Sequence, residues 1–411
     1  MTNEEYISLH RCEDTSALAL RRAPEGVDLK YCLEQIKSRQ KAVRKLPHWA
    51  AVDGLVFPPS LSMEQCSSET TAKYKQELVE RILSSEERFS MVDLTSGFGV
   101  DFSYLALLFR QSVYVEQQQR LCEIARHNLP LLGLGHAEVH CADGTAFLKN
   151  MDYADLIFMD PARRDDCGRK TVQLEDCTPC VTTMLPDLIQ RCRFLLVKLS
   201  PMLDIRVALK ALKYVCEVHV VSVDGECREL LLLLDATECR PVSFHCVNLG
   251  RKPNCFVVED MSHVVSVAVD GPSAYLYEPN ASVLKAGVQD ALCDRFGVEK
   301  LHRNSNLFTS AQLVEDFPGR VFCVRSCFDF SKQSLKALQL QVRKANLTVR
   351  NFPSTVDQLR KRLKLKEGGD VYLFATTLAD ESHVLVQCEK VELIKMMYNK
   401  KQINEDEECI P

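Results

Sequence analysis

The 411-residue sequence predicts an α/β fold built on a mainly parallel sheet with helices on both faces. Short apolar segments typical of buried strands alternate with amphipathic segments between residues 85 and 238. A glycine turn, Gly97-Phe98-Gly99, follows the first of these strands and opens a helix. The last two strand segments flank Asp224-Gly225, which indicates a terminal hairpin.

The element predictions follow from periodicity and from turn residues. Seven strands are expected at 90–94, 112–115, 137–140, 154–159, 193–199, 215–223 and 229–234. Helices are expected between them at 101–109, 118–132, 144–149, 182–190 and 205–212. Before them, helices are expected at 27–49, closing near Pro47, and at 69–83. One further helix is expected at 281–296, and Gly368-Gly369 is expected to form a turn.

The changes in pattern along the chain predict five regions. They are an N-terminal helical region (1–84), the α/β core (85–238), a strand-rich segment (239–329), a compact C-terminal α/β unit (330–397) and an acidic tail (398–411). The basic residues are unevenly distributed: residues 331–366 contain ten Lys or Arg and one acid, Asp357. This excess suits a phosphate-bearing partner, and a solvated helix face is the alternative.

The composition is that of a water-soluble globular protein. No secretory signal is visible at the acidic N-terminus, and the longest apolar run, residues 230–234, is too short to span a bilayer. Nineteen scattered cysteines then indicate reduced, mostly buried thiols, although Cys177-Thr-Pro-Cys180 leaves a zinc or redox pair open. We therefore expect a cytoplasmic protein that has no membrane anchor, no metal site and no obligate protein partner.

Acidic residues follow successive strands of the predicted sheet. Glu116 ends the second strand, seventeen residues after Gly99, where a carboxylate can accept hydrogen bonds from ribose hydroxyls. Asp143 follows the third strand and can accept from an adenine amino group or cap the next helix. A solvated loop acid is the alternative for Glu116. The candidate cofactor-binding residues are Asp93, Thr95, Gly97, Gly99, Glu116, Asp143 and Gly144.

The fourth strand ends in Asp160-Pro161-Ala-Arg163-Arg164. Four apolar residues between Asp155 and Asp160 fit a buried strand that brings Asp160 to the carboxyl edge of the sheet, where ligands collect in such folds. Asp160, Pro161 and Arg163 are the candidate catalytic residues, and Arg164 offers a charge for a phosphate. A structural Asp-Pro turn is the alternative.

The order Asp93-x-x-x-Gly97-x-Gly99, Glu116, Asp143 and Asp160-Pro161 resembles the class I S-adenosylmethionine-dependent methyltransferases. The resemblance covers about residues 85–235 and implies a Rossmann-like, seven-stranded core that binds S-adenosylmethionine. Ser67 and Ser68, with Gln65, either line that cofactor site or cap the helix that begins at Glu69.

Further motifs resemble one bacterial methyltransferase family that carries a THUMP-like C-terminal domain. They are Glu64-Gln65-Cys-Ser67-Ser68-Glu69, Lys198-Leu-Ser200-Pro201, Tyr277-Glu278-Pro279-Asn280 and Val349-Arg350-Asn351-Phe352-Pro353. The resemblance implies a ferredoxin-like segment near 270–318 and a THUMP-like domain near 330–395. THUMP domains in other proteins present RNA to modifying enzymes, and with the basic segment 331–366 this makes RNA the expected substrate. The candidate RNA-binding residues are Arg164, Arg343, Lys344, Arg350, Arg360, Lys361 and Arg362.

Two departures and two alternatives qualify this prediction. Ala162 and Arg163 replace the Pro-aromatic pair of exocyclic-amine methyltransferases. The fifth strand ends in Lys198-Leu-Ser200-Pro201 and lacks the cysteine nucleophile that C5-pyrimidine methyltransferases need near this point. An NAD-type oxidoreductase would use the same turn, but it predicts a third glycine where Phe102 stands. An RNA-binding protein with a relic core is the second alternative.

Overall fold

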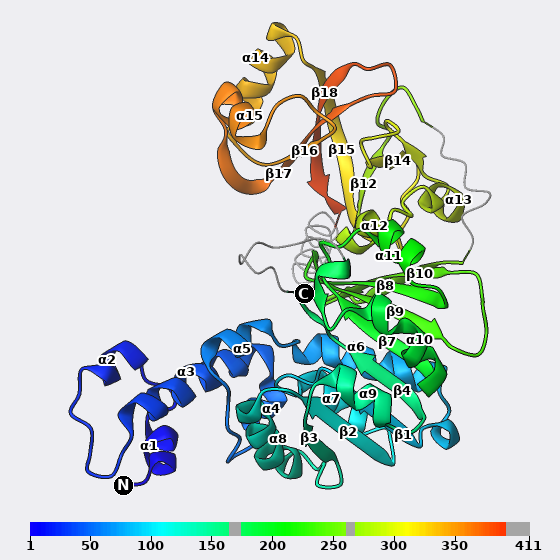
Figure 1. Ribbon diagram of the computed structural model, residues 1–411. Coiled ribbons are helices and arrows are strands. Elements are labelled where there is room, and N and C mark those ends of the chain that lie inside the picture. The colour runs from blue at the N-terminus through cyan, green and yellow to red at the C-terminus, as the bar shows by residue number, and fades with distance from the viewer. Residues whose placement is uncertain (164–173, 260–267, 392–411) are drawn as a thin grey trace, which may run out of the picture. The chain divides into compact units, whose positions relative to one another are not determined.

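A computed structural model describes residues 1–163, 174–259 and 268–391. The chain forms two compact units (Figure 1). Unit 1 comprises Met1–Val218 and Glu229–Val242, and unit 2 comprises His219–Arg228 and Ser243–Pro411. The tip of the predicted terminal hairpin therefore belongs to unit 2. The tail at 398–411 lies outside the described residues.

Unit 1 begins with helices, as predicted. They are α1 (Asn3–His10), α2 (Thr15–Ala19), α3 (Leu29–Lys45), α4 (Pro47–Ala51), α5 (Ser60–Gln65) and α6 (Glu69–Ile82), followed by the 3₁₀ turn η1 (Ser85–Glu87). The helix expected over 27–49 closes just before Pro47, as predicted: α3 ends at Lys45, and the chain leaves helical geometry at Leu46, with φ −138° and ψ 62°. The following Pro47 disfavours helical backbone at Leu46 and starts α4 instead. Trp49 on α4 packs against Phe98, their ring centroids 5.0 Å apart.

The seven predicted strands are all present and form the core of unit 1. They are β1 (Ser90–Asp93), β2 (Gln111–Glu116), β3 (Glu138–Cys141), β4 (Ala154–Met159), β7 (Cys192–Leu199), β8 (Val215–Val223) and β9 (Glu226–Asp235). Their order is β3-β2-β1-β4-β7-β9-β8 (Figure 1). The pairs from β3 to β7 are parallel, whereas β9 runs antiparallel to β7. Together, β8 and β9 form the predicted terminal hairpin of a methyltransferase-type sheet.

The predicted helices of the core are also present. They are α7 (Val100–Ala106), α8 (Gln119–Leu131), α9 (Gly144–Asn150), α10 (Val181–Arg191) and α11 (Ile205–Ala211). The carboxylates of Asp143 and Asp204 cap α9 and α11, which satisfies amides that have no partner inside the helix. Short elements between β4 and α10 are β5 (Ala162–Arg163), η2 (Leu174–Asp176) and β6 (Cys177–Thr178).

Unit 2 contains a seven-stranded sheet of order β13-β14-β12-β15-β18-β17-β16. Its strands are β12 (Tyr275–Pro279), β13 (Glu299–Lys300), β14 (Phe308–Ser310), β15 (Gly319–Asp329), β16 (Lys344–Arg350), β17 (Lys366–Thr377) and β18 (His383–Lys390). Its helices are α12 (Ala281–Ala286), α13 (Ala291–Phe296), α14 (Lys332–Gln341) and α15 (Val356–Leu363). Strands β10 (Ser243–Leu249) and β11 (Asn254–Val258) form an antiparallel pair.

Two predictions for unit 2 are wrong. The helix expected at 281–296 is interrupted at Gly287, whose φ of 75° ends α12. Gly368 and Gly369 lie inside β17 rather than in a turn before it, with φ values of 90° and 84°. The register against β16 shifts at this point, so the two glycines form a bulge.

Candidate functional site

The turn after β1 is shaped by two glycines with left-handed backbone. Gly97 has a φ of 56° and Gly99 a φ of 85°, a conformation that a residue with a Cβ rarely adopts. The Gly97 amide donates a hydrogen bond to Glu116 Oε2 at 3.1 Å, and the Gln118 amide donates to Glu116 Oε1 at 2.8 Å. The predicted glycine turn and the acid at the end of β2 are therefore joined directly.

Glu116 and Asp143 lie on neighbouring strand ends, as their spacing predicts. Glu116 is opposite Cys141 in the parallel β2–β3 ladder, and the Ala142 amide donates to the Glu116 carbonyl at 3.1 Å. The exposed Asp143 caps α9 through Oδ1, which accepts from the Ala146 amide at 2.9 Å. A capping carboxylate keeps acceptor capacity on its second oxygen. Asp143 can therefore act as a cap and still bind a ligand.

Gly144 has a packing role that the sequence did not reveal. A Cβ at this position would lie 2.3 Å from the Leu94 carbonyl oxygen, a distance that no real contact of this kind shows. The start of α9 therefore approaches the end of β1 so closely that only glycine fits. This contact explains the residue without a bound ligand.

Asp93 and Thr95 hold the β1 end in place. Asp93 is 1% exposed, and its Oδ1 accepts from the Thr95 amide at 2.9 Å. Burial, reinforced by the charges of Asp101 and Asp160, raises the pKa of Asp93 well above its usual range. The Thr95 hydroxyl accepts from the Asp160 amide at 2.6 Å. These two predicted cofactor residues thus connect the glycine turn to the end of β4.

Asp160 stands at the carboxyl end of β4, between the β1 turn and β7. Its side chain is 37% exposed, whereas Pro161 is buried. The backbone of Arg163 pairs with Cys177 in the small β5–β6 ladder. Arg164 and Cys167 lie outside the described residues. The structure therefore places Asp160 and Pro161 at the predicted sheet edge and leaves the Arg163 and Arg164 side chains untested.

A buried charge cluster, formed by Lys75, Asp101, Asp160, Lys198 and Glu229, reaches the same edge. Lys198 Nζ lies 2.5 Å from Asp160 Oδ2 and 3.2 Å from Asp101 Oδ2. On the inner side, Lys75 Nζ lies 3.1 Å from Asp101 Oδ1 and 2.6 Å from Glu229 Oε1. Alternating charges thus run from the fully buried Lys75 to the partly exposed Asp160.

The cluster shifts the titration of its members. Burial lowers the pKa of Lys198, but the carboxylates of Asp160 and Asp101 outweigh it and raise the pKa well above its usual range. Burial raises the pKa of Asp101, but the ammonium groups of Lys75 and Lys198 outweigh it and lower the pKa to about 2. Burial also raises the pKa of Glu229. Lys198 and Asp101 therefore stay charged at neutral pH.

The sequence contains a signal for this cluster. Lys198 interrupts the apolar run Phe194-Leu-Leu-Val, and a charge inside a buried strand needs a partner. Ser67 belongs to the same network: it donates to Asp101 Oδ2 at 2.6 Å and accepts from Lys198 Nζ at 2.9 Å. Ser68, in contrast, caps α6 by accepting from the Thr71 amide. The two serines thus have separate roles.

No disulfide links the cysteines that the structure describes, Cys177 and Cys180 included. The redox pair that this spacing left open is therefore not formed as a disulfide. Burial raises the pKa of Cys192 and of Cys122 to about 12 in each case. Both of these thiols stay protonated at neutral pH.

The predicted RNA-binding residues of unit 2 differ in their surroundings. Arg343 and Lys361 are exposed, and the Lys344 side chain packs over the glycine bulge. The Arg362 guanidinium lies 4.4 Å from the centroid of the Phe330 ring. Arg360 is half-buried, with Nη2 3.8 Å from Glu367 Oε1. Arg350 pairs with the buried Glu278 at 2.7 Å, which gives Arg350 a structural role beside any contact with RNA.

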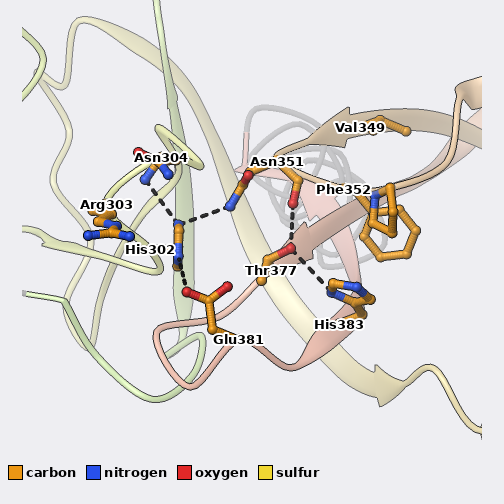
Figure 2. A pocket seen from close by; sticks show the side chains of 10 residues that line it. His302, Arg303, Asn304, Val349, Asn351, Phe352, Thr377, Glu381 and His383 are labelled. Atoms are coloured by element: carbon orange, nitrogen blue, oxygen red, sulfur yellow. Dashed lines mark hydrogen bonds and ion pairs between the residues drawn. The ribbon is translucent and has the colours of Figure 1, made fainter.

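The Val349–Pro353 motif lines a pocket of about 590 Å³ in unit 2 (Figure 2). Its centre is His302, whose Nδ1 accepts from the Asn304 amide at 3.0 Å and from Asn351 Nδ2 at 2.9 Å. The proton of this ring therefore lies on Nε2, 3.2 Å from Glu381 Oε1. The remaining lining residues include a cation and two rings: Arg303, Val349, Phe352, Pro353, Thr377 and His383.

In the described parts of the chain, every helix is too short or too polar to cross a bilayer. Two family models match unit 2: a ferredoxin-like domain at residues 275–318 and a THUMP domain-like model at residues 319–390. No curated protein matches the sequence.

Two solved structures resemble this chain, one over part of its length and one over nearly all of it. An rRNA methylase from Streptococcus thermophilus matches 39% of this chain and 93% of its own at 14% identity, with a TM-score of 0.31. The crystal structure of a "putative methyltransferase" from Porphyromonas gingivalis W83 matches 95% of this chain and 97% of its own at 33% identity, with a TM-score of 0.84. The chain therefore belongs to the family of this Porphyromonas gingivalis protein, and it combines a methyltransferase-type core with ferredoxin-like and THUMP-like domains.

Proposed function

We propose that the protein is an S-adenosylmethionine-dependent methyltransferase that acts on RNA. One observation carries the proposal: Glu116, Asp143 and Asp160 follow strands of one parallel sheet, beside a left-handed glycine turn. This edge is where open α/β sheets bind ligands. The family relationship supports the same activity.

The residues at the sheet edge fit the cofactor. The Glu116 and Asp143 carboxylates suit the ribose hydroxyls and the adenine amino group, and the turn at Gly97 has no side chain to obstruct a nucleoside. S-adenosylmethionine supplies a methyl group on a positively charged sulfur. Asp160 and the Pro161 carbonyl are placed to orient the acceptor. Because methyl transfer needs mainly alignment, positioning can supply up to about 7–11 kcal/mol of the barrier reduction.

Unit 2 supports RNA as the substrate. Ten of residues 331–366 are basic, and Lys361 and Arg343 present their charges to solvent. The pocket around His302 adds Arg303 for a phosphate and Phe352 for a base (Figure 2). Its opening also carries Glu381, which disfavours a phosphate placed directly beside that carboxylate.

Transfer of a labelled methyl group tests the proposal. The full chain is incubated with labelled S-adenosylmethionine and total cellular RNA, and label in the RNA is measured after protein removal. Asp160→Ala should abolish incorporation, whereas Asp152→Ala, at an exposed carboxylate after α9, should leave it unchanged. Label in protein or small molecules and none in RNA would overturn the RNA assignment.

A further inference from the structure

Burying the charges of the cluster costs free energy of desolvation, which is offset only if each charge has close ion pairs and hydrogen bonds. Lys75 is fully buried, and the side chains of Asp101 and Glu229 are 9% and 6% exposed. Each buried ammonium group contacts two carboxylates, and the Ser67 hydroxyl donates a hydrogen bond to Asp101 Oδ2. Such a network fixes the Lys198 ammonium in one position beside Asp160.

Structural stability alone does not account for where the cluster ends. Its inner members join α6, α7 and β9. Its outer pair, Lys198 and Asp160, stands at the carboxyl edge of the sheet, where Asp160 is 37% exposed. An ammonium and a carboxylate held 2.5 Å apart at a ligand-binding edge are placed to act on a bound group.

The fixed ammonium distinguishes between acceptor atoms. A neutral amine gains positive charge as it takes a methyl group from a sulfonium, and a nearby ammonium opposes that change. A hydroxyl instead loses its proton, and the oxygen carries negative charge during the transfer, which an ammonium stabilises. Since the pKa of Lys198 is raised, the group stays charged at neutral pH.

We propose that the Asp160–Lys198 pair binds a ribose hydroxyl as the methyl acceptor. This inference rests on the proposed methyltransferase function and on RNA as its substrate. Within an RNA strand the 3′ and 5′ oxygens are esterified, so the free hydroxyl is the 2′-OH. The inner residues Lys75, Asp101 and Glu229 then act as positioning residues that hold Lys198.

The proposed methyl transfer moves one proton from the hydroxyl and one methyl group from the sulfur. The hydroxyl proton passes to the Asp160 carboxylate as the oxygen–hydrogen bond breaks. The oxygen forms a bond to the methyl carbon, and the electron pair of the broken carbon–sulfur bond stays on the donor's sulfur, which becomes a neutral thioether. Lys198 stabilises the charge on the acceptor oxygen. Asp160 then releases its proton to water, to which its side chain is partly open.

Alkaline hydrolysis of the methyl-labelled RNA tests this inference. Alkali cleaves RNA through the 2′-hydroxyl, so a 2′-O-methyl group protects the adjacent bond and leaves the label in dinucleotides. We expect labelled dinucleotides. Label in mononucleotides would mean methylation of a base and would overturn the hydroxyl assignment. Absence of label from RNA would overturn the proposed function itself, and the hydroxyl assignment with it.

Variants assign the roles of the pair. Lys198→Met should lower transfer about 100-fold or more, Asp160→Asn by a comparable factor, and Lys198→Arg should retain more activity than Lys198→Met. The matched controls Lys213→Met and Asp152→Asn, at exposed positions of unit 1, should be unaffected.

Calorimetric binding of S-adenosylhomocysteine provides a readout that is independent of turnover. Asp160→Asn and Lys198→Arg should bind it within about threefold of the unmodified protein, because the pair serves the acceptor. A loss of affinity that parallels the loss of transfer would assign the pair to the cofactor and overturn the inference. Thermal unfolding identifies a Lys198→Met protein that fails to fold, in which case Asp160→Asn decides.

Discussion

At the residue scale, the core of unit 1 contains a network of buried charged side chains in place of apolar ones. Lys75 and Lys198 lie among three carboxylates, two of them nearly inaccessible. Removing one member of such a network leaves another charge unpaired, which costs more than the network contributes. The cluster should therefore be sensitive to single substitutions.

The acid stability of the protein should depend on Asp101. Its pKa falls from an ordinary value of 3.8 to about 2 on folding, so its ionisation stabilises the fold above about pH 4 and less as the pH drops towards 2. Asp101→Asn should lower the free energy of unfolding by about 3 kcal/mol at pH 7. Urea unfolding should show this difference shrinking between pH 4 and pH 2. A difference that is constant with pH would contradict the ion-paired state.

At the element scale, the end of β1 contacts three neighbouring segments of the core. The Thr95 hydroxyl holds the Asp160 amide, the Gly97 amide holds Glu116, and Leu94 contacts the start of α9. Three neighbouring segments are thus positioned by one turn. A change in this turn should affect both stability and cofactor binding.

Substitution of Gly144 tests the close approach of α9 to the end of β1. Gly144→Ala places a methyl group against the Leu94 carbonyl, and such overpacking typically costs about 1–3 kcal/mol. Gly135→Ala is the control, because a Cβ there meets nothing within 4 Å. Chemical unfolding should show a loss for Gly144→Ala and none of that size for Gly135→Ala. Equal stability of the two variants would contradict the close approach.

At the scale of the whole molecule, one chain joins the candidate ligand-binding edge of the sheet and a basic segment, residues 331–366. Among residues 360–362, Lys361 is exposed, whereas the Arg362 guanidinium stacks on Phe330 and Arg360 is partly buried. If these basic side chains contact phosphates, the affinity for RNA depends on the salt concentration.

Charge reversal at Arg360, Lys361 and Arg362 should weaken RNA binding and flatten its salt dependence. Each lost phosphate contact should reduce the slope of log affinity against log salt by about 0.7–0.9. Lys361→Glu alone isolates the exposed charge, and Arg295→Glu on α13 is a control with the same charge change at an exposed site. Filter binding across a salt series measures the slopes. If the triple variant keeps the original slope, residues 360–362 are a solvated helix face.

The sequence predicted the core well because most of its strands are rich in apolar residues and its turns contain glycine or Asp. All seven strands and the positions of Glu116, Asp143 and Asp160 followed from local pattern. The bulge at Gly368-Gly369 and the close contact of Gly144 did not, since each depends on what the backbone meets in three dimensions. The charge cluster was missed for the same reason: Lys75, Lys198 and Glu229 are far apart in sequence and meet only in the fold.

Calorimetric titration of the full chain tests the central claim most directly. At about 100 μM protein, a micromolar affinity is readily measured. We predict binding of S-adenosylmethionine and S-adenosylhomocysteine, loss of both on Glu116→Ala, and no binding of NAD. Binding of NAD alone, or no heat with either sulfur compound, would contradict the methyltransferase assignment.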